Sequence, residues 1–206
     1  ARDAAEAVAV DLEALASAPD VDRALAKEAP AIWPQAPGNI ALDWEDGNMA
    51  AVEAAFAGAA HIERTRLIDT RLAPSAMEPR AAIASFDALS GRYTLIAPTQ
   101  GVAVVRKVFA ESVFKIPANQ IRVLTHDVGG GFGMKVQPYS DYAALLYAAR
   151  RVQRPVKWCA SRLESFLTDT HGRDGVLEAE LALDAAGKFL GLRAHTYVGI
   201  GAYTTT

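Results

Sequence analysis

The segment HDVGGGFGMK, residues 126–135, has three successive glycines, a phenylalanine, a fourth glycine and then a lysine. It follows the apolar run IRVL, and we predict a strand over residues 121–128 that leads into the glycines. Glycine adopts positive φ readily and has no Cβ atom, so successive N–H groups in such a turn can surround an anion or an oxo group. The segment therefore predicts either a binding turn or a turn that serves close packing alone.

The nucleotide-binding motifs do not account for these glycines. A dinucleotide fingerprint, G-x-G-x-x-G, would require a third glycine at Met134 when counted from Gly129, or at Val136 when counted from Gly131. A P-loop would require Gly before Lys135 and Ser or Thr after it, but Met134 and Val136 stand there. A nucleotide-binding enzyme is therefore the weakest of the functional hypotheses.

Outward from the glycines, the sequence alternates between helical and extended patterns, which predicts an α+β (mixed α/β) fold. We expect Ser140 or Asp141 to cap the helix that follows the glycine segment. The predicted helices span residues 50–59, 100–114 and 140–152, and a further helix begins the chain and runs into a short strand at 8–15. One further strand is predicted to begin at Ile62. The remaining strands are predicted over residues 81–87, 93–99, 154–161, 176–184 and 189–203.

The ends of the sequence do not resemble domain borders, which are usually polar and loose. The chain opens with Ala inside a helical pattern and stops after an apolar, extended stretch. We therefore expect it to be a piece of a longer protein. The proline-containing stretch 18–40 is interpreted as a linker between two packed units, or else as a surface loop within one domain.

Composition excludes several classes of protein. Of the 206 residues, 51% are hydrophobic and 22% are charged, which is typical of a globular chain with a substantial core. The net charge of −3 provides no general attraction to nucleic acid or to an anionic membrane. No apolar run is long enough to cross a bilayer. Cys159 is the sole cysteine, so neither a disulfide within the chain nor a cysteine metal motif is expected.

Six motifs occur in an order that resembles the molybdopterin-binding large subunits of molybdenum hydroxylases, the family of aldehyde oxidase, xanthine dehydrogenase and carbon monoxide dehydrogenase. They are AMEPRAAIASFD (76–87), TQ (99–100), VFKIPANQIRVLTHDVGGGFGMK (113–135), RPVKW (154–158), SRLESF with HGR (161–173) and GAY (201–203). The resemblance implies that residues 1–30 end a hammerhead-like domain. Residues 31–59 would then be a linker and connecting helix, and residues 60–206 an incomplete molybdopterin-binding domain.

The same resemblance implies a cofactor site at the glycine segment. By the match, the turn formed by Gly130, Gly131, Phe132 and Gly133 lies against the molybdenum and its pterin dithiolene and donates backbone N–H groups. Phe132 would also form one wall of the substrate pocket. Gln100 matches the glutamine whose amide hydrogen-bonds an oxygen ligand of the metal, a role that an amide fills without adding charge.

The resemblance places neither a metal ligand nor a catalytic residue in this chain. In the family the dithiolene holds the molybdenum, and the general-base glutamate lies late in the large subunit, in a region that this chain lacks. Purine-oxidising members have an acidic residue after the motif lysine, where this chain has Val136. This difference favours an aldehyde or another small substrate.

The remaining polar residues near the motifs are interpreted as structural. We expect Glu78 and Arg80 to form a structural ion pair near the pocket and Cys159 to be a small buried residue. The histidines, with Arg173, make a separate set: His126 is interpreted as a strand residue with a local hydrogen bond, His171 with Arg173 as organising a loop, and His61 and His195 as ordinary strand residues.

The function that follows is oxidative hydroxylation by the parent protein, with water as the oxygen source. Iron–sulfur clusters and FAD would be carried by other domains or subunits, the rest of the large subunit would be a further partner, and the isolated chain would be inactive. The alternative is a non-catalytic folding or subunit-interaction module without cofactor. We also expect self-association through unpaired strand edges, and a cytoplasmic location, or a periplasmic one if the parent is exported.

Overall fold

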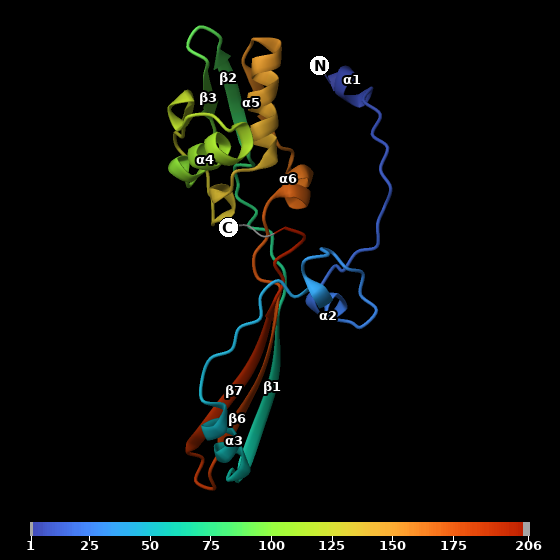
Figure 1. Ribbon diagram of the computed structural model, residues 1–206, viewed down its shortest axis with the longest axis vertical. Helices are drawn as coiled ribbons and strands as arrows, with labels where there is room; N and C mark the ends of the chain where they lie inside the picture. The colour runs from blue at the N-terminus through green and yellow to red at the C-terminus, as the bar shows by residue number, and fades with distance from the viewer. Residues whose placement is uncertain (1, 204–206) are drawn as a thin grey trace. The chain divides into compact units, whose positions relative to one another are not determined.

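The computed structural model describes residues 2–203, which fall into two compact units (Figure 1). The first unit comprises two separate stretches of the chain, Ala1–Thr70 and Asp174–Thr204, and the second is the intervening segment Arg71–Arg173. None of the helices formed by the described residues combines the length and the apolar character that crossing a membrane requires.

The second unit is built on a mixed four-stranded sheet in the order β4-β3-β2-β5. β2 pairs antiparallel with both β3 and β5, whereas β3 pairs parallel with β4. The strands are β2 (Ala81–Asp87), β3 (Arg92–Ile96), β4 (Ile121–Leu124) and β5 (Val156–Cys159).

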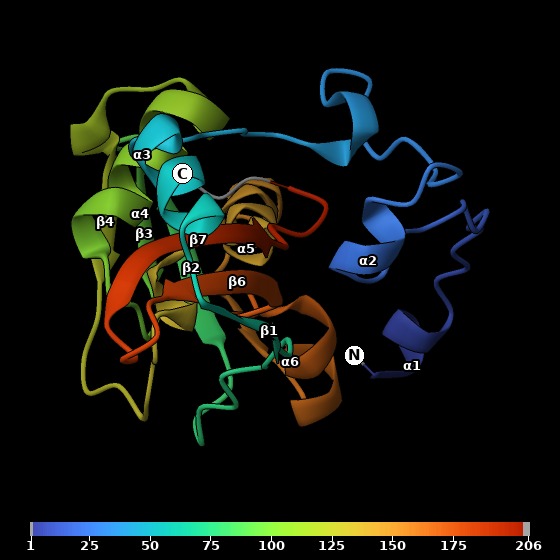
Figure 2. The ribbon, with the colours of Figure 1, turned by 90° about the horizontal axis from the view of Figure 1, so that it is seen from below.

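Two helices cover one face of this sheet. α5 (Ser140–Val152) packs along β2 and its neighbours, and α4 (Val102–Val108) packs against β4, as Figures 1 and 2 show. Alternate strand residues such as Ala84 and Leu95 are fully buried beneath them, while Ile83 between the buried positions of β2 is exposed. The period of two in each strand therefore produces a core on one side only.

Shorter elements complete this unit. α4 continues without a break into a π-helix, Phe109–Phe114, so the helix predicted over residues 100–114 is confirmed in outline but widens in its second half. A helix of two turns, α6 (Arg162–Thr168), follows β5. Two 3₁₀ turns, Ala118–Gln120 and Met134–Val136, precede β4 and α5 respectively.

Several predictions for this unit were wrong. The strand predicted over 121–128 ends at Leu124, where the pairing with Ile96 also ends. The N-cap of α5 is Tyr139 without a side-chain hydrogen bond, because the carboxylate of Asp141 binds Arg80 instead. Cys159 is exposed rather than buried, since Trp158 beside it faces the core and neighbouring strand residues point to opposite faces.

The first unit contains an antiparallel three-stranded sheet in the order β1-β6-β7. Its strands are β1 (His61–Asp69), β6 (Gly175–Leu183) and β7 (Phe189–Val198), so the predicted hairpin is confirmed, although its second strand ends at Val198. α3 (Met49–Ala57) packs on β7, where a Cβ atom on Gly191 would lie 2.9 Å from the Cβ of Ala55. Asn48 caps the N-terminus of α3.

The N-terminal part of this unit has little regular structure. Its elements are α1 (Arg2–Glu6), α2 (Val21–Ala24) and a 3₁₀ turn, Pro37–Asn39. The strand predicted at residues 8–15 does not form: no strand pairs with this segment, and its large apolar side chains, from Val8 to Leu15, are exposed. A lone extended segment does not make a strand, because its backbone groups need a neighbour.

Candidate functional site

The glycine loop, residues 129–136, follows β4 after residues 125–128 and ends in the 3₁₀ turn Met134–Val136 in the second unit. Its backbone turns sharply, since Gly130 has φ +99°, Phe132 has φ +52° and Gly133 has φ +83°. Phe132 is thus a non-glycine residue in the left-handed region, where most residues are unfavourable. The phenylalanine therefore occupies a conformation that its surroundings impose.

Gln100 binds the C-terminal part of the glycine loop. Its Oε1 atom accepts hydrogen bonds from the N–H groups of Gly133 at 3.1 Å and Lys135 at 3.2 Å. Its own backbone N–H donates to the Lys135 carbonyl at 3.0 Å, and the Thr99 hydroxyl donates to the same carbonyl at 2.9 Å. The structure thus brings together Gln100 and the glycine residues that were predicted to share a site.

Three successive N–H groups of the loop have no acceptor among the residues that the structure describes. Among residues 2–203, the N–H groups of Gly130, Gly131 and Phe132 donate no hydrogen bond, whereas those of the residues on either side do. The Nε2 group of Gln100 likewise makes no hydrogen bond within the described part of the chain. Successive free N–H groups in a turn of this kind are suited to an electron-rich ligand.

The absence of side chains at the glycines has a cause within the chain itself. A Cβ atom on Gly131 would lie 2.4 Å from the Cδ and Oε1 atoms of Gln100, and one on Gly129 would lie 2.6 Å from the Cβ of Glu78. Gly130 and Gly133 need glycine for their positive φ. The closest approach to the loop is therefore made by Gln100 and Glu78.

Glu78 is a residue of this site whose role sequence reasoning missed. Its carboxylate pairs with Lys135 at 2.7 Å, not with Arg80, so the predicted Glu78–Arg80 pair is wrong. Burial pushes the pKa of Glu78 upward, but hydrogen bonds from Lys135 and from the Gly129 N–H outweigh it and lower the pKa. The motif GGFGMK itself contained the signal, a lysine that has to be neutralised once it is buried.

Arg80 forms a separate buried centre in the second unit. Its fully buried guanidinium donates to Asp169 at 2.5 Å, to Asp141 at 2.7 Å and to the Thr168 hydroxyl at 2.8 Å, and it lies 3.7 Å from the centroid of the Tyr139 ring. Burial lowers the pKa of Arg80, but these carboxylates more than compensate, so the pKa is raised. Arg80 is therefore a permanent cation with a structural role.

Phe132 is 74% exposed and its ring edge lies over Gly130, 3.2 Å from the position that a Cβ atom would take there. Met77 next to Glu78 is 92% exposed. Large exposed apolar side chains on or near a loop with free N–H groups are typical of ligand sites, which combine apolar walls with a few placed polar groups. The exposed Phe132 is compatible with the predicted role as a wall.

The histidines contribute nothing to this loop. His126 lies beyond the end of β4, so its interpretation as a strand residue was wrong. His171 Nε2 contacts the Phe166 carbonyl at 3.1 Å, within the segment that it was predicted to organise. His61 and His195 lie in β1 and β7, as predicted. In the part of the chain that the structure describes, no cluster of His, Cys, Asp and Glu could hold a metal ion.

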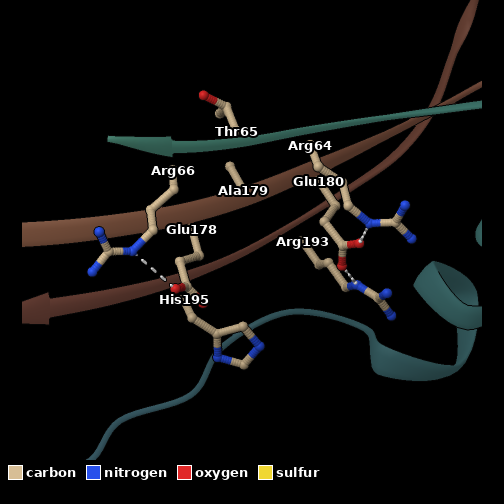
Figure 3. Close-up of a pocket in the computed structure, with 8 residues that line it drawn as sticks. All are labelled: Arg64, Thr65, Arg66, Glu178, Ala179, Glu180, Arg193 and His195. Atoms are coloured by element: carbon tan, nitrogen blue, oxygen red, sulfur yellow. Dashed lines mark hydrogen bonds and ion pairs between the residues drawn. The ribbon is translucent and has the colours of Figure 1, made fainter. Parts of the chain in front are cut away.

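A depression of about 460 Å³ occurs elsewhere, on the sheet of the first unit (Figure 3). Figure 3 shows its charged side chains on one face of β1, β6 and β7, with Thr65 and Ala179 pointing to the other. The charges of its arginines are neutralised in part by carboxylates that do not line the depression. Arg66 pairs with Asp22, and Arg193 pairs with Glu53. Besides Thr65 and Ala179, the residues that line it are Arg64, Arg66, Glu178, Glu180, Arg193 and His195. None of the predicted site residues is among them.

Comparison with known proteins identifies the class to which this fold and loop belong. Residues 32–206 match the model of the molybdopterin cofactor-binding domain, and the chain belongs to this family. The large chain of carbon monoxide dehydrogenase from Hydrogenophaga pseudoflava is 34% identical, over 98% of this chain and 27% of the relative. Subunit gamma of the 6-hydroxypseudooxynicotine dehydrogenase complex from Paenarthrobacter nicotinovorans is 32% identical, over 98% of this chain and 25% of the relative.

Solved structures agree. Reconstituted CO dehydrogenase from Oligotropha carboxidovorans superimposes with a TM-score of 0.84 and 32% identity, over 95% of this chain and 26% of that one. The aldehyde oxidoreductase from Desulfovibrio gigas superimposes with a TM-score of 0.82 and 25% identity, over 96% of this chain and 21% of that one. The predicted family and mixed α/β fold are confirmed. The chain spans about a quarter of the length of the curated relatives it matches.

Proposed function

We propose that this chain supplies part of the molybdenum-cofactor site in the large subunit of a molybdenum hydroxylase, and that the glycine loop and Gln100 contact the cofactor. The observation that carries the proposal is the set of free donors, the N–H groups of Gly130, Gly131 and Phe132 and the Gln100 amide. When bound, the cofactor supplies two-electron redox chemistry, for which the protein provides binding and orientation.

Each of these residues has a defined task in the proposal. The free N–H groups donate to an electron-rich group of the cofactor, and Gly133 provides the turn that presents them. Gln100 uses Oε1 to fix the loop, which leaves Nε2 as a donor without a charge. The exposed ring of Phe132 excludes water from one side of the substrate pocket.

The activity of the parent protein follows from the same proposal: oxidative hydroxylation of an aldehyde or another small substrate. The general base, the iron–sulfur clusters and FAD come from other parts of the large subunit or from partner subunits. Residues 1–30 belong to the hammerhead-like part, 31–59 to the linker and connecting helix, and 60–206 to the cofactor-binding part. We place the parent in the cytoplasm, or in the periplasm if it is exported.

The experiment measures molybdenum and pterin in the large subunit that contains this chain, by elemental analysis and by fluorescence of the oxidised pterin. Gly131→Val forces the Gln100 amide aside, so we expect at least a tenfold loss of both. Gln100→Glu keeps the acceptor for Gly133 and Lys135 but removes the Nε2 donor, and we expect cofactor loss with an intact loop.

Gly58→Ala is the matched control, because its added Cβ meets only an ordinary contact of 3.6 Å with the Ala54 carbonyl. This variant should retain both molybdenum and pterin. Wild-type protein that contains neither would contradict the proposal and favour the alternative, a folding or subunit-interaction module without cofactor.

A further inference from the structure

One carboxylate oxygen contacts both ends of the glycine loop. Glu78 Oε2 accepts a hydrogen bond from the Gly129 N–H at 2.9 Å and another from Lys135 Nζ at 2.7 Å. The backbones are linked as well, because the Glu78 N–H donates to the Gly129 carbonyl at 3.1 Å. The free donors from Gly130 to Phe132 therefore lie between two residues that are tied to the same atom.

The lysine of this pair is buried, so the pairing contributes to the stability of the folded chain. The Lys135 side chain has no exposed surface, whereas the side chain of Glu78, the carboxylate that neutralises it, is 38% exposed. Removing the carboxylate leaves a buried ammonium group uncompensated, which is unfavourable. Lys135 also carries the backbone N–H and carbonyl that bind Gln100 and Thr99. A change in the contact between Glu78 and Lys135 therefore also affects the contacts of the loop with Gln100 and Thr99.

The backbone that carries Glu78 is itself fixed. Ala76 is fully buried, and Arg162 Nη2 donates to the carbonyls of Ala76 at 2.6 Å and Met77 at 3.0 Å. On the other side, Arg80 is anchored to Asp169. Pro79 also restricts Glu78 to extended conformations. The carboxylate therefore approaches the loop from a rigid segment.

We propose that Glu78 is the positioning residue of the glycine loop: through Gly129 and Lys135 it sets where the free N–H groups of Gly130, Gly131 and Phe132 lie. It acts through the loop and does not itself touch the cofactor. The link between Glu78 and a cofactor rests on the proposed function, whereas the control of the loop by Glu78 is testable without any cofactor.

The test is hydrogen exchange at the hydrogen-bonded loop amides, those of Gly129 and of residues 133–136, in the Glu78→Gln variant of the large subunit. Glutamine keeps an oxygen acceptor of similar size but loses the charge that neutralises Lys135. We expect exchange at these amides to accelerate at least tenfold, while the amides of β2 and β3 keep their wild-type rates. Molybdenum and pterin content should fall in parallel.

Glu180→Gln is the matched control, since this carboxylate also accepts from two side chains, Arg64 and Arg193, but lies on β6. It should leave loop exchange and cofactor content unchanged. The double variant Glu78→Gln with Lys135→Met removes both charges and guards against misfolding of the single variant. It should restore stability relative to Glu78→Gln, yet retain fast exchange at Gly129.

The outcomes separate the two proposals. Unchanged loop exchange in Glu78→Gln overturns the positioning role, whatever the cofactor content. Faster exchange in a protein whose wild type binds no molybdenum or pterin supports the role of Glu78 and overturns the proposed function. Faster exchange with full cofactor retention would show that the loop tolerates displacement, which also contradicts the inference.

Discussion

Gly131 and Arg80 show how single residues in this protein are constrained by close neighbours. Gly131 has no room for a Cβ atom because Gln100 lies against it. Arg80 is enclosed by Asp169, Asp141 and the ring of Tyr139, so a charge that would be very costly alone is neutralised on several sides. In both cases the identity of the residue follows from a partner that is distant in the sequence.

Arg80→Met should destabilise the protein strongly. It leaves the Asp169 side chain, which is only 5% exposed, without its cation, and the expected loss is about 3–5 kcal/mol. Urea denaturation followed by tryptophan fluorescence measures it. Arg122→Met, at an exposed position of β4, is the control and should change stability by less than about 0.5 kcal/mol. Equal effects of the two variants would contradict the structural role of Arg80.

The two tyrosines beside Arg80 should respond differently to loss of the hydroxyl. Tyr139 donates to the Met134 carbonyl at 2.7 Å and accepts from the Thr170 N–H at 3.1 Å, so Tyr139→Phe should cost about 1–3 kcal/mol. Within residues 2–203 no group meets hydrogen-bond geometry with the buried Tyr142 hydroxyl, although Arg80 is close enough to lower its pKa. Tyr142→Phe should therefore be nearly neutral or stabilising. Thermal unfolding of both variants distinguishes these results.

Tyr142 also predicts a pH dependence. Burial, partly offset by Arg80, raises its pKa from 10.0 to about 12. Between these values the folded state keeps a proton that the unfolded state loses, so the contribution to stability is complete below pH 10.0 and declines as pH rises toward 12. Burial raises the pKa of Tyr139 as well, so the late part of an alkaline titration of tyrosinate absorbance should lose one tyrosine, not vanish, in Tyr142→Phe. An unchanged late phase in that variant would refute the assignment.

At the scale of the elements, the sheet of the second unit is covered on one face only. Periodicity of two in β2 and of 3.6 in α5 made these elements predictable, because both patterns are local. The ends of the elements were less predictable. β4 stops where its partner β3 stops, and Asp141 binds Arg80 instead of capping α5. Element type follows from the local pattern, whereas element boundaries depend on the neighbours.

α6 offers a test at this scale because it begins with a complete capping box. The Ser161 hydroxyl accepts from the Glu164 N–H, and the Glu164 carboxylate accepts from the Ser161 N–H. Ser161→Ala should cost about 1 kcal/mol, since it leaves an N–H at the helix start unpaired. Ser161→Asp retains an acceptor and should lose much less. Identical unfolding midpoints for the two variants would argue against the cap.

At the scale of the whole chain, the first unit presents open strand edges and an uncovered apolar face. β1 and β7 are the edge strands, and the face opposite the charged one carries Leu67, Leu177, Leu181, Leu192 and Val198. Of these, Leu67, Leu192 and Val198 are more than half exposed. Such edges and faces favour association with another surface.

We predict that the isolated chain self-associates. Light scattering at micromolar concentration should report a dimer or a larger species, and Leu192→Lys should shift it toward the monomer by placing a charge on the apolar face. Lys188→Leu, at the exposed end of the hairpin, is the reverse control and should not favour the monomer. A sharp monomer peak for the unmodified chain would count against the prediction.

The sequence alone determined the family, the mixed α/β fold and the order of most helices and strands, because motif spacing and hydrophobic periodicity are properties of consecutive residues. It also indicated that Gln100 and the glycine loop belong to one site, through the resemblance. Only the tertiary structure decided that Glu78 pairs with Lys135 rather than Arg80, that Gln100 turns its oxygen toward the loop, and that Cys159 faces outward. Glu78 and Lys135 are 57 positions apart, and no local pattern records which of several charges a buried lysine will meet once the strands are ordered in a sheet.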